Sequence, residues 1–196
     1  MNMKHSLEPS SLELQEVLTA LYQASFVPET TMPHYRPDGA TDQWALDLRI
    51  GLSDHSLLHP IAQHLGQLIL SRGVTQIVGR GYGSAFLLGG IVATNPAFCG
   101  GIIRETAKAY GFKKLIEGSI QNNRPVFLVD DVLSSGRSAG EALAVLQTQG
   151  FPVAGLATVF RYGWRRSEER LKDYQIPIYS LATLFPNCEP NNQGQH

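Results

Sequence analysis

Residues 125–138 of the chain are Pro125-Val126-Phe127-Leu128-Val129-Asp130-Asp131-Val132-Leu133-Ser134-Ser135-Gly136-Arg137-Ser138. The apolar run 126–129 is rich in β-branched residues, which predicts a strand buried on both faces of a parallel sheet. Asp130 and Asp131 then stand where this strand is expected to leave the sheet. The turn that follows is made of small hydroxyl residues and one glycine, so its backbone amides and side chains can all face one anion.

An amphipathic helix is expected over residues 139–149, directly after this turn. Ser138 and Glu141 have the spacing of a capping box, which predicts that the helix begins there with its positive dipole end facing the turn. Three apolar residues supply a core face and a glycine stops the helix: Ala142, Leu143, Leu146 and Gly150.

These parts restrict the ligand, because two carboxylates beside an anion-binding turn would repel a bare phosphate. A neutral or cationic group must separate them. A sugar diol meets this need by donating hydrogen bonds to the carboxylates, and so does Mg²⁺. Phosphoribosyl pyrophosphate (PRPP) carries a phosphate, a vicinal diol and a metal-binding pyrophosphate, and therefore fits the stretch.

Length and composition predict one domain over residues 1–196 with a small additional lobe, since 43% of the residues are hydrophobic. The 16 basic and 17 acidic side chains nearly cancel, so no large field attracts nucleic acid or an anionic membrane. Cys99 and Cys188 lie far apart without metal-ligand spacing, which suits a reducing compartment.

No apolar stretch approaches the length of a membrane span, and the first residues lack the hydrophobic block of a secretion signal. We therefore expect a cytoplasmic protein with no membrane partner. Residues 187–196 are polar and contain a proline, and we expect a disordered tail.

The N-terminal part predicts a first helix after Ser10 or Ser11, followed by an irregular hood lobe over about residues 26–50. Proline and glycine break the chain there, and Trp44, Leu46 and Leu48 alternate with polar neighbours as in a half-buried strand. A long helix is expected over residues 57–71, stopped by Gly73.

Strands and helices then alternate, with strands expected at 75–78, 101–103, 126–129, 153–160 and 176–181 and a helix at 85–94. Such alternation predicts an α/β fold with a twisted, mostly parallel sheet flanked by helices. Ligands bind such sheets beyond the carboxyl ends of the strands.

The stretch from Val126 to Ser138 resembles the PRPP-binding motif of the type I phosphoribosyltransferases. The resemblance implies the fold of that family, with a small hood lobe, and Mg²⁺ as cofactor. It implies that Asp130 and Asp131 are catalytic, bind the ribose hydroxyls and contact the metal indirectly, through ribose or water. The 5′-phosphate would be bound by Ser134, Ser135, Gly136, Arg137 and Ser138.

The loop Gly79–Ser84 contains three glycines, which allow backbone to approach a ligand closely. The resemblance implies that it holds the pyrophosphate, through Arg80, Gly81, Tyr82 and Gly83. The alternative is a dinucleotide fingerprint. That alternative needs an acid at the end of the next strand, and Arg104 stands there, so only an NADP-binding oxidoreductase remains as a competing hypothesis.

Residues 104–117 are long, charged and without a clean period, which predicts a flexible lid. The segment resembles the catalytic loop of the orotate phosphoribosyltransferases. Arg104 matches that family's arginine, which would contact the pyrophosphate, and Lys108 matches its catalytic lysine. Glu105 replaces a second lysine and Tyr110 replaces a histidine. Since that loop reaches into a partner's site, the resemblance implies a homodimer that shares the lid.

A weaker resemblance covers residues 35–44, which match the stretch that lines the family's base pocket. Pro37 replaces a lysine that contacts the base, and Gly83 replaces a lysine common in the pyrophosphate loop of the orotate enzymes. Arg161 matches an arginine that contacts the base, although a surface role beside Arg165 and Arg166 is equally compatible with the sequence.

The expected function is transfer of the phosphoribosyl group from PRPP to a nitrogenous base, orotate or a related pyrimidine, with release of pyrophosphate. A non-catalytic PRPP-sensing module is the second hypothesis, and the departures at Pro37, Gly83, Glu105 and Tyr110 favour it. The retention of Lys108 and the lack of a recognisable nucleic-acid-binding segment count against it.

Overall fold

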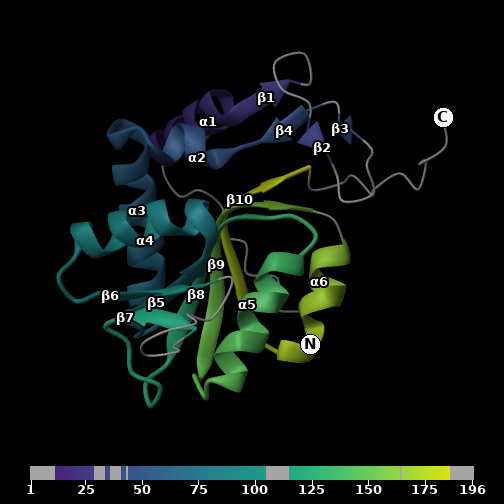
Figure 1. Cartoon of the computed structure of the whole chain (residues 1–196). Coiled ribbons are helices and arrows are strands. Elements are labelled where there is room, and N and C mark those ends of the chain that lie inside the picture. The colour runs from purple at the N-terminus through teal and green to yellow at the C-terminus, as the bar shows by residue number, and fades with distance from the viewer. Residues whose placement is uncertain are drawn as a thin grey trace.

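The computed structural model describes residues 12–28, 34–35, 41–42, 44–104, 115–163 and 165–185. Its centre is a six-stranded sheet with the strand order β10-β9-β8-β5-β6-β7 (Figure 1). Neighbouring strands are parallel except at one edge, where β7 runs antiparallel to β6. The predicted α/β class and mostly parallel sheet are therefore confirmed. The strands are β5 (Gln76–Arg80), β6 (Cys99–Ile103), β7 (Ile116–Gly118), β8 (Val126–Leu133), β9 (Val153–Tyr162) and β10 (Ile178–Leu184).

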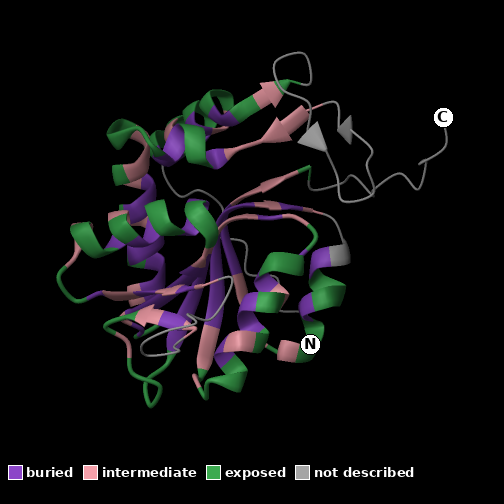
Figure 2. Ribbon diagram, viewed as in Figure 1, coloured by how far each residue is buried: buried purple, intermediate pink, exposed green. Residues whose placement is uncertain are grey.

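Helices cover both faces of this sheet because its central strands are apolar on both sides (Figure 2). One core joins α1 (Leu12–Ser25), α3 (His55–Leu70) and α4 (Gly81–Thr94) to side chains such as Phe127 and Val129. The other joins α5 (Arg137–Thr148) and the end of α6 (Arg165–Leu171) to side chains such as Val78 and Leu128. Successive residues of β5 and β8 thus contribute to opposite cores, as the alternation of a strand requires.

The hood lobe lies beyond the carboxyl ends of the central strands (Figure 1). Strand β1 (Phe26–Pro28) pairs antiparallel with β4 (Trp44–Leu46), and β2 (His34–Tyr35) pairs with β3 (Thr41–Asp42). The strand predicted around Trp44 ends earlier than its alternation indicated. Asp47 accepts a hydrogen bond from the Arg49 amide at 3.1 Å and so caps a short helix, α2 (Leu48–Leu52).

Helix α3 starts two residues before the predicted boundary because Asp54 caps it, and Pro60 lies inside the helix. It ends at Leu70, and Gly73 has the left-handed φ of 74° expected after a helix stop. The strands predicted at 75–78, 101–103, 153–160 and 176–181 are present with slightly different bounds.

Three local predictions at the functional edge of the sheet were wrong. Strand β8 continues to Leu133, so Asp130 and Asp131 lie within a strand rather than after it. The expected loop 79–84 is absent, because β5 runs to Arg80 and α4 begins at Gly81. The capping box is also absent: α5 begins at Arg137 after a left-handed Gly136, without a side-chain cap.

Sequence periodicity missed β7, α6 and the 3₁₀ turn Lys172–Tyr174. Strand β7 is only three residues long and overlaps the last two residues of the segment expected to be a lid, so the carboxyl end of that segment is part of the sheet edge. Residues 105–114, which make up the rest of the predicted lid, lie outside the described residues, as does the predicted tail 187–196.

Candidate functional site

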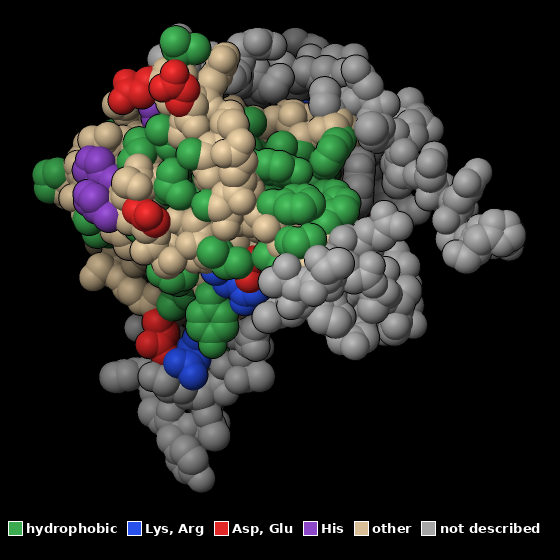
Figure 3. Space-filling view, turned by 90° about the horizontal axis from the view of Figure 1, so that it is seen from above, with side chains coloured by type: hydrophobic (Ala, Val, Ile, Leu, Met, Phe, Trp, Pro, Cys, Tyr) green, Lys and Arg blue, Asp and Glu red, His purple; other side chains and the backbone are tan. Residues whose placement is uncertain are grey.

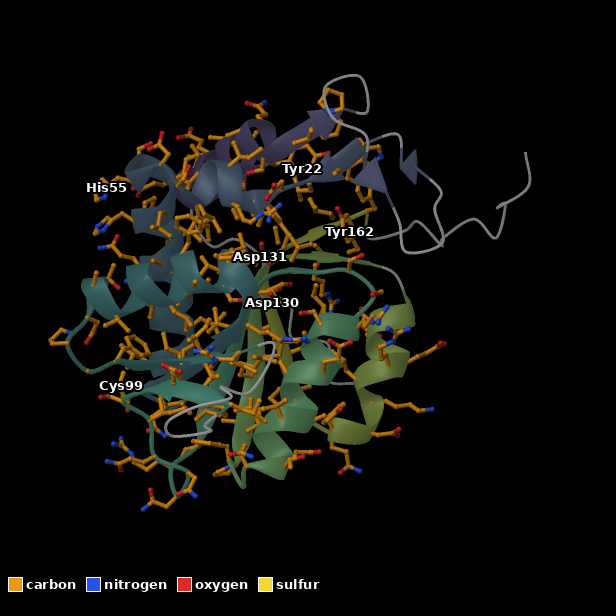
Figure 4. All side chains as sticks on the ribbon, viewed as in Figure 1. Tyr22, His55, Cys99, Asp130, Asp131 and Tyr162 are labelled. Atoms are coloured by element: carbon orange, nitrogen blue, oxygen red, sulfur yellow. The ribbon has the colours of Figure 1, made fainter. Side chains whose placement is uncertain are left out.

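The acid pair lies where β8 is still paired with β9 but is no longer paired with β5. Strand β5 pairs with β8 only as far as Val129, whereas β9 remains paired from Asp130 to Leu133. Asp130 and Asp131 therefore lie at the carboxyl edge of the sheet, beneath the hood, with Tyr162 nearby (Figure 4). This is the edge at which parallel sheets bind ligands.

Asp130 is held among groups that leave its charge poorly solvated. Its Oδ1 accepts a hydrogen bond from the backbone amide of Asp131 at 3.0 Å and lies 3.1 Å from the Ser84 hydroxyl of α4. Burial of the carboxyl group, followed by the neighbouring charge of Asp131, raises the pKa of Asp130 from 3.8 to about 8. The side chain therefore keeps its proton to a higher pH than an ordinary carboxyl group does.

Asp131 points toward the first turn of α4. Its Oδ1 accepts the Val132 amide at 2.9 Å, while its Oδ2 lies where a side chain on Gly83 would begin. A Cβ on Gly83 would overlap Asp131 Oδ2 and Cγ and would stand 3.1 Å from Asp131 Cβ. In this conformation Asp131 therefore occupies the space that a side chain at position 83 would need.

The hood presents an arginine to the same acid, a residue that sequence reasoning missed. Arg49 Nε and Nη2 each lie 2.6 Å from an oxygen of Asp47, which forms a two-pronged ion pair. The pKa of the Arg49 guanidinium is raised, mainly by Asp47 and to a smaller extent by the charge of Asp131. The signal in the sequence was the spacing of Asp47 and Arg49 at a helix start.

The turn that was predicted to bind the 5′-phosphate is built around Gly136. Gly136 adopts φ 74° and is buried against α6, and the N-terminus of α5 begins at the next residue. Ser134 is half-buried, whereas Ser135, Arg137 and Ser138 are exposed. The first amides of α5 therefore face the solvent edge beside the acid pair, where a helix dipole favours a bound anion.

A second helix N-terminus faces the same edge, because α4 starts at Gly81, which has φ 82°. Tyr82 projects into solvent with 77% of its surface exposed, and Ser84 Oγ lies 2.8 Å from the Arg80 carbonyl. The acid pair on β8 thus stands between the N-terminal turns of α4 and α5. An electrostatic arrangement of this kind suits a ligand with two anionic ends and a neutral or cationic middle.

Arg80, expected at the pyrophosphate, is engaged elsewhere in this structure. Its Nη1 forms a short ion pair with Glu141 Oε2 of α5, and Arg137 Nε lies 3.1 Å from the other oxygen of the same carboxylate. The two predicted phosphate sites are therefore joined through Glu141, a residue that the sequence assigned only to helix capping.

Two further predicted arginines also form ion pairs. Arg104 Nη1 lies 2.8 Å from Glu117 Oε1, which connects the end of β6 to β7. Arg161 Nη1 lies 3.4 Å from Glu168 Oε1 of α6, and its buried Nε has no hydrogen-bond partner among the described residues. Arg161 is therefore directed toward α6. Lys108, Glu105 and Tyr110 lie outside the described residues, as does Pro37.

An aromatic cluster joins the hood to the sheet next to the site, and periodicity gave no hint of it. Trp44 stacks on Phe26 with a centroid distance of 5.8 Å, and Tyr162 stacks on Phe185 at 5.9 Å. Trp44 also lies 5.8 Å from Phe185 and 6.2 Å from Tyr162. From above, hydrophobic side chains gather over the middle of this face, beside small areas of charge (Figure 3).

The donor set fits a Mg²⁺ ion that takes most of its ligands from a substrate and water. Asp130 and Asp131 supply two adjacent carboxylates, and among the described residues no three or more His, Cys, Asp or Glu side chains are grouped so that they could hold a metal ion. Magnesium commonly binds through one or two carboxylates together with substrate phosphates. Cys99 lies away from this edge, at the start of β6 (Figure 4).

The chain resembles known orotate phosphoribosyltransferases in sequence. The enzyme of Bacillus pumilus is 32% identical over 139 residues, which cover 69% of this chain and 65% of that protein. The enzyme of Bacillus subtilis is 37% identical over 80 residues, covering 41% of this chain and 37% of that protein. The chain thus spans less than two thirds of the length of these relatives. No protein-family model matches it.

Solved structures resemble the chain over most of its length. An orotate phosphoribosyltransferase of Mycobacterium tuberculosis has a TM-score of 0.75 at 23% identity, covering 88% of this chain and 97% of that one. The adenine phosphoribosyltransferase of Thermoanaerobacter pseudethanolicus has a TM-score of 0.63 at 13% identity, covering 85% and 99%. The predicted resemblance is confirmed, and the fold is that of the type I phosphoribosyltransferases.

None of the helices within the described residues is both long and apolar enough to cross a membrane.

Proposed function

We propose that this chain, which has the type I phosphoribosyltransferase fold and orotate phosphoribosyltransferases as sequence relatives, transfers the phosphoribosyl group of PRPP to orotate or a related pyrimidine base. Pyrophosphate is the second product. The observation that carries the proposal is the position of Asp130 and Asp131 between the N-terminal turns of α4 and α5. A structure of the Mycobacterium tuberculosis relative contains PRPP, which supports the assignment.

In the proposed reaction the bond from ribose C1 to the pyrophosphate oxygen breaks, and pyrophosphate leaves with the bonding electrons. A bond from C1 to a ring nitrogen of the base replaces it, and the proton of that nitrogen passes to water or to the departing pyrophosphate. Asp130 and Asp131 accept hydrogen bonds from the ribose hydroxyls and stabilise positive charge that develops on the sugar. The turn from Ser134 to Ser138 holds the 5′-phosphate, while Gly81, Tyr82 and Gly83 approach the pyrophosphate.

Magnesium would bind near Asp130 and Asp131 and supply charge neutralisation of the pyrophosphate oxygens. Burial and the charge of Asp131 raise the pKa of Asp130, so this carboxyl group would have to lose its proton before it could help to hold the ion. Lys108 and Arg104 are the proposed cations for the departing pyrophosphate, and Arg161 the proposed contact to the base. Arg161 would reach a base through its unpartnered Nε or by leaving Glu168.

The test is pyrophosphate release from PRPP and Mg²⁺ in the presence of a panel of pyrimidine and purine bases, with the nucleotide identified by mass spectrometry. We expect turnover with orotate or a close pyrimidine, reduced at least ~100-fold in Lys108→Ala, since general acid–base and charge groups contribute factors of this size. No turnover of any base would refute the proposal.

A PRPP-sensing module is the second candidate, and one observation favours it. The space in which the orotate enzymes commonly carry a lysine is filled by Asp131, which leaves no room for a side chain at Gly83. Tight PRPP binding without turnover of any base would establish this alternative. The oxidoreductase hypothesis has less support, because Gly79 lies inside β5 and packs against Ser84 and Leu88 of α4.

We also propose that the chain forms a homodimer, with α4 at the interface. Helix α4 carries no charged residue over its 14 residues, yet Tyr82, Phe86 and Val92 are exposed on it. A helix that is apolar all round is normally buried. Sedimentation should give the dimer mass for the native chain and the monomer mass for Phe86→Glu. A native chain that sediments as a monomer would contradict the proposal.

A further inference from the structure

Glu141 is bound by two arginines that come from the two turns flanking the acid pair. Arg80, the last residue of β5, contacts Glu141 Oε2 through Nη1, and Arg137, the first residue of α5, lies 3.1 Å from Oε1 through Nε. One carboxylate thus engages cations from both proposed phosphate sites. Arg80 and Glu141 are 61 positions apart in the chain, so the contact depends on the fold.

The strand and the helix explain why these three side chains meet. Alternation along β5 places Val78 in the core beneath α5, and it directs Arg80, two residues later, to the same side. Arg137 and Glu141 are four residues apart on α5 and share one helix face. Glu141 therefore lies one turn inside α5, next to the turn proposed for the 5′-phosphate.

The carboxylate has no other structural task in the described residues. Helix α5 begins at a left-handed Gly136 without a side-chain cap, so Glu141 does not satisfy the helix start. Its side chain remains 46% exposed, and an exposed ion pair of this kind contributes little to stability. The pKa of Glu141 is lowered, chiefly by Arg80 and then by Arg137, so the group is ionised at neutral pH.

We propose that Glu141 is an internal anion that holds Arg80 and Arg137 in the empty site and releases them to a phosphate group of the substrate. This inference rests on the proposed function, since it takes PRPP as the competing ligand. Two arginines and one glutamate carry a net charge of +1, and a phosphate dianion attracts the guanidinium groups more strongly than an exposed carboxylate does. Each arginine contacts Glu141 through one nitrogen of its guanidinium group, which has further N–H donors for a phosphate.

Arg80 then has a role at the 5′-phosphate as well as at the pyrophosphate. Because its guanidinium lies on the α5 side of the sheet, it is a positioned cation beside the 5′-phosphate turn as well as a neighbour of the pyrophosphate turn. Binding of substrate then requires exchange of Arg80 from Glu141 to phosphate. Glu141 is a positioning residue, because it holds Arg80 in place and lowers the affinity of the site for phosphate groups. An anion that cannot take Arg80 away from Glu141 therefore binds weakly.

The test is calorimetric titration of Glu141→Gln with inorganic pyrophosphate and with PRPP plus Mg²⁺ at low ionic strength. We expect the variant to bind each probe about 3- to 5-fold more tightly than the native chain, which is the size expected from one exposed ion pair. Glu169→Gln, an equal change of charge at an exposed position of α6, is the matched control and should alter affinity less. Unchanged or weaker binding by Glu141→Gln would overturn the proposal.

A double-mutant cycle distinguishes the transfer of Arg80 from Glu141 to phosphate from a simple repulsion between Glu141 and the anionic ligand. In an Arg80→Gln background the gain from Glu141→Gln should largely disappear, because the arginine that the glutamate occupies is gone. A gain of equal size in both backgrounds would show that Glu141 acts only by repelling anions and would overturn the exchange. Failure of the native chain to bind PRPP at all would instead refute the proposed function.

Discussion

Asp130 is buried beside a second carboxylate, and this pairing makes its protonation state the central property of the free site. The pKa of about 8 arises first from burial and then from the charge of Asp131. The folded chain therefore binds a proton at Asp130 that the unfolded chain releases near pH 4. Stability from this group is fully present below pH 4 and is lost as pH rises toward 8.

The first prediction concerns Asp130→Asn, which keeps the shape of the side chain and cannot ionise. We expect the native chain to lose free energy of unfolding between pH 6 and pH 8.5, by roughly 1.4 kcal/mol for each unit of pH below the folded pKa. The variant should lose less over the same range. Urea unfolding at several pH values measures this difference, and parallel curves for the two proteins would show that Asp130 is already ionised.

The second prediction concerns Gly83, where the structure has no room for a side chain. Restoring the common lysine by Gly83→Lys should displace Asp131 and lower both stability and PRPP binding, with an overpacking cost of about 1–3 kcal/mol. Ala144→Lys on the exposed face of α5, which introduces the same charge away from α4, is the control. A Gly83→Lys variant with increased transferase activity would contradict the geometry described for Asp131.

At the scale of elements, the strand–turn–helix from β8 to α5 was predictable because its signals are local: an apolar run, two acids, small residues and an amphipathic segment. The ends of the strand and the start of the helix were not predictable. Strand β8 extends past Val129 because β9 continues to pair with it, a contact between distant parts of the chain. Likewise, Ser138 and Glu141 do not form the predicted capping box. Glu141 instead forms an ion pair with Arg80, the last residue of β5.

The same limit applies to the candidate site. The acid pair and the turn before α5 could be located from sequence because they belong to one short segment, whereas the loop expected at 79–84 proved to be a strand end and a helix start. The approach of Asp131 to Gly83, its charge effect on Arg49 and the aromatic cluster around Trp44 could not be predicted, because each joins segments far apart in the chain. Short elements such as β7 and α6 are likewise set by tertiary packing and have little periodicity of their own.

The third prediction tests the turn before α5 as a structural element. Gly136 and Gly150 share a left-handed φ, 74° and 75°, but a Cβ at position 136 would lie 3.2 Å from Ser167 Cα whereas position 150 is open. Gly150→Ala should therefore lose about 1–2 kcal/mol from backbone strain alone. Gly136→Ala should lose more and also weaken phosphate binding. Equal losses in chemical unfolding would show that α6 does not constrain the turn.

At the scale of the whole molecule, the fold brings a hood, two helix N-termini and an acid pair to one edge of the sheet. The hood is attached there by Trp44, whose ring lies 6.2 Å from that of Tyr162 and 5.8 Å from that of Phe185. The hood thus lies over the edge of the sheet that carries the acid pair.

The central claim is that the acid pair and the turn before α5 hold the ribose and 5′-phosphate of one PRPP molecule. Calorimetric titration with PRPP and Mg²⁺ tests it most directly, in the native chain and in Asp131→Asn, with the exposed Asp173→Asn as control. We predict binding of one PRPP per chain that weakens at least ~10-fold in Asp131→Asn and is unchanged in Asp173→Asn. Absence of PRPP binding to the native chain, or equal affinity in Asp131→Asn, would contradict the claim.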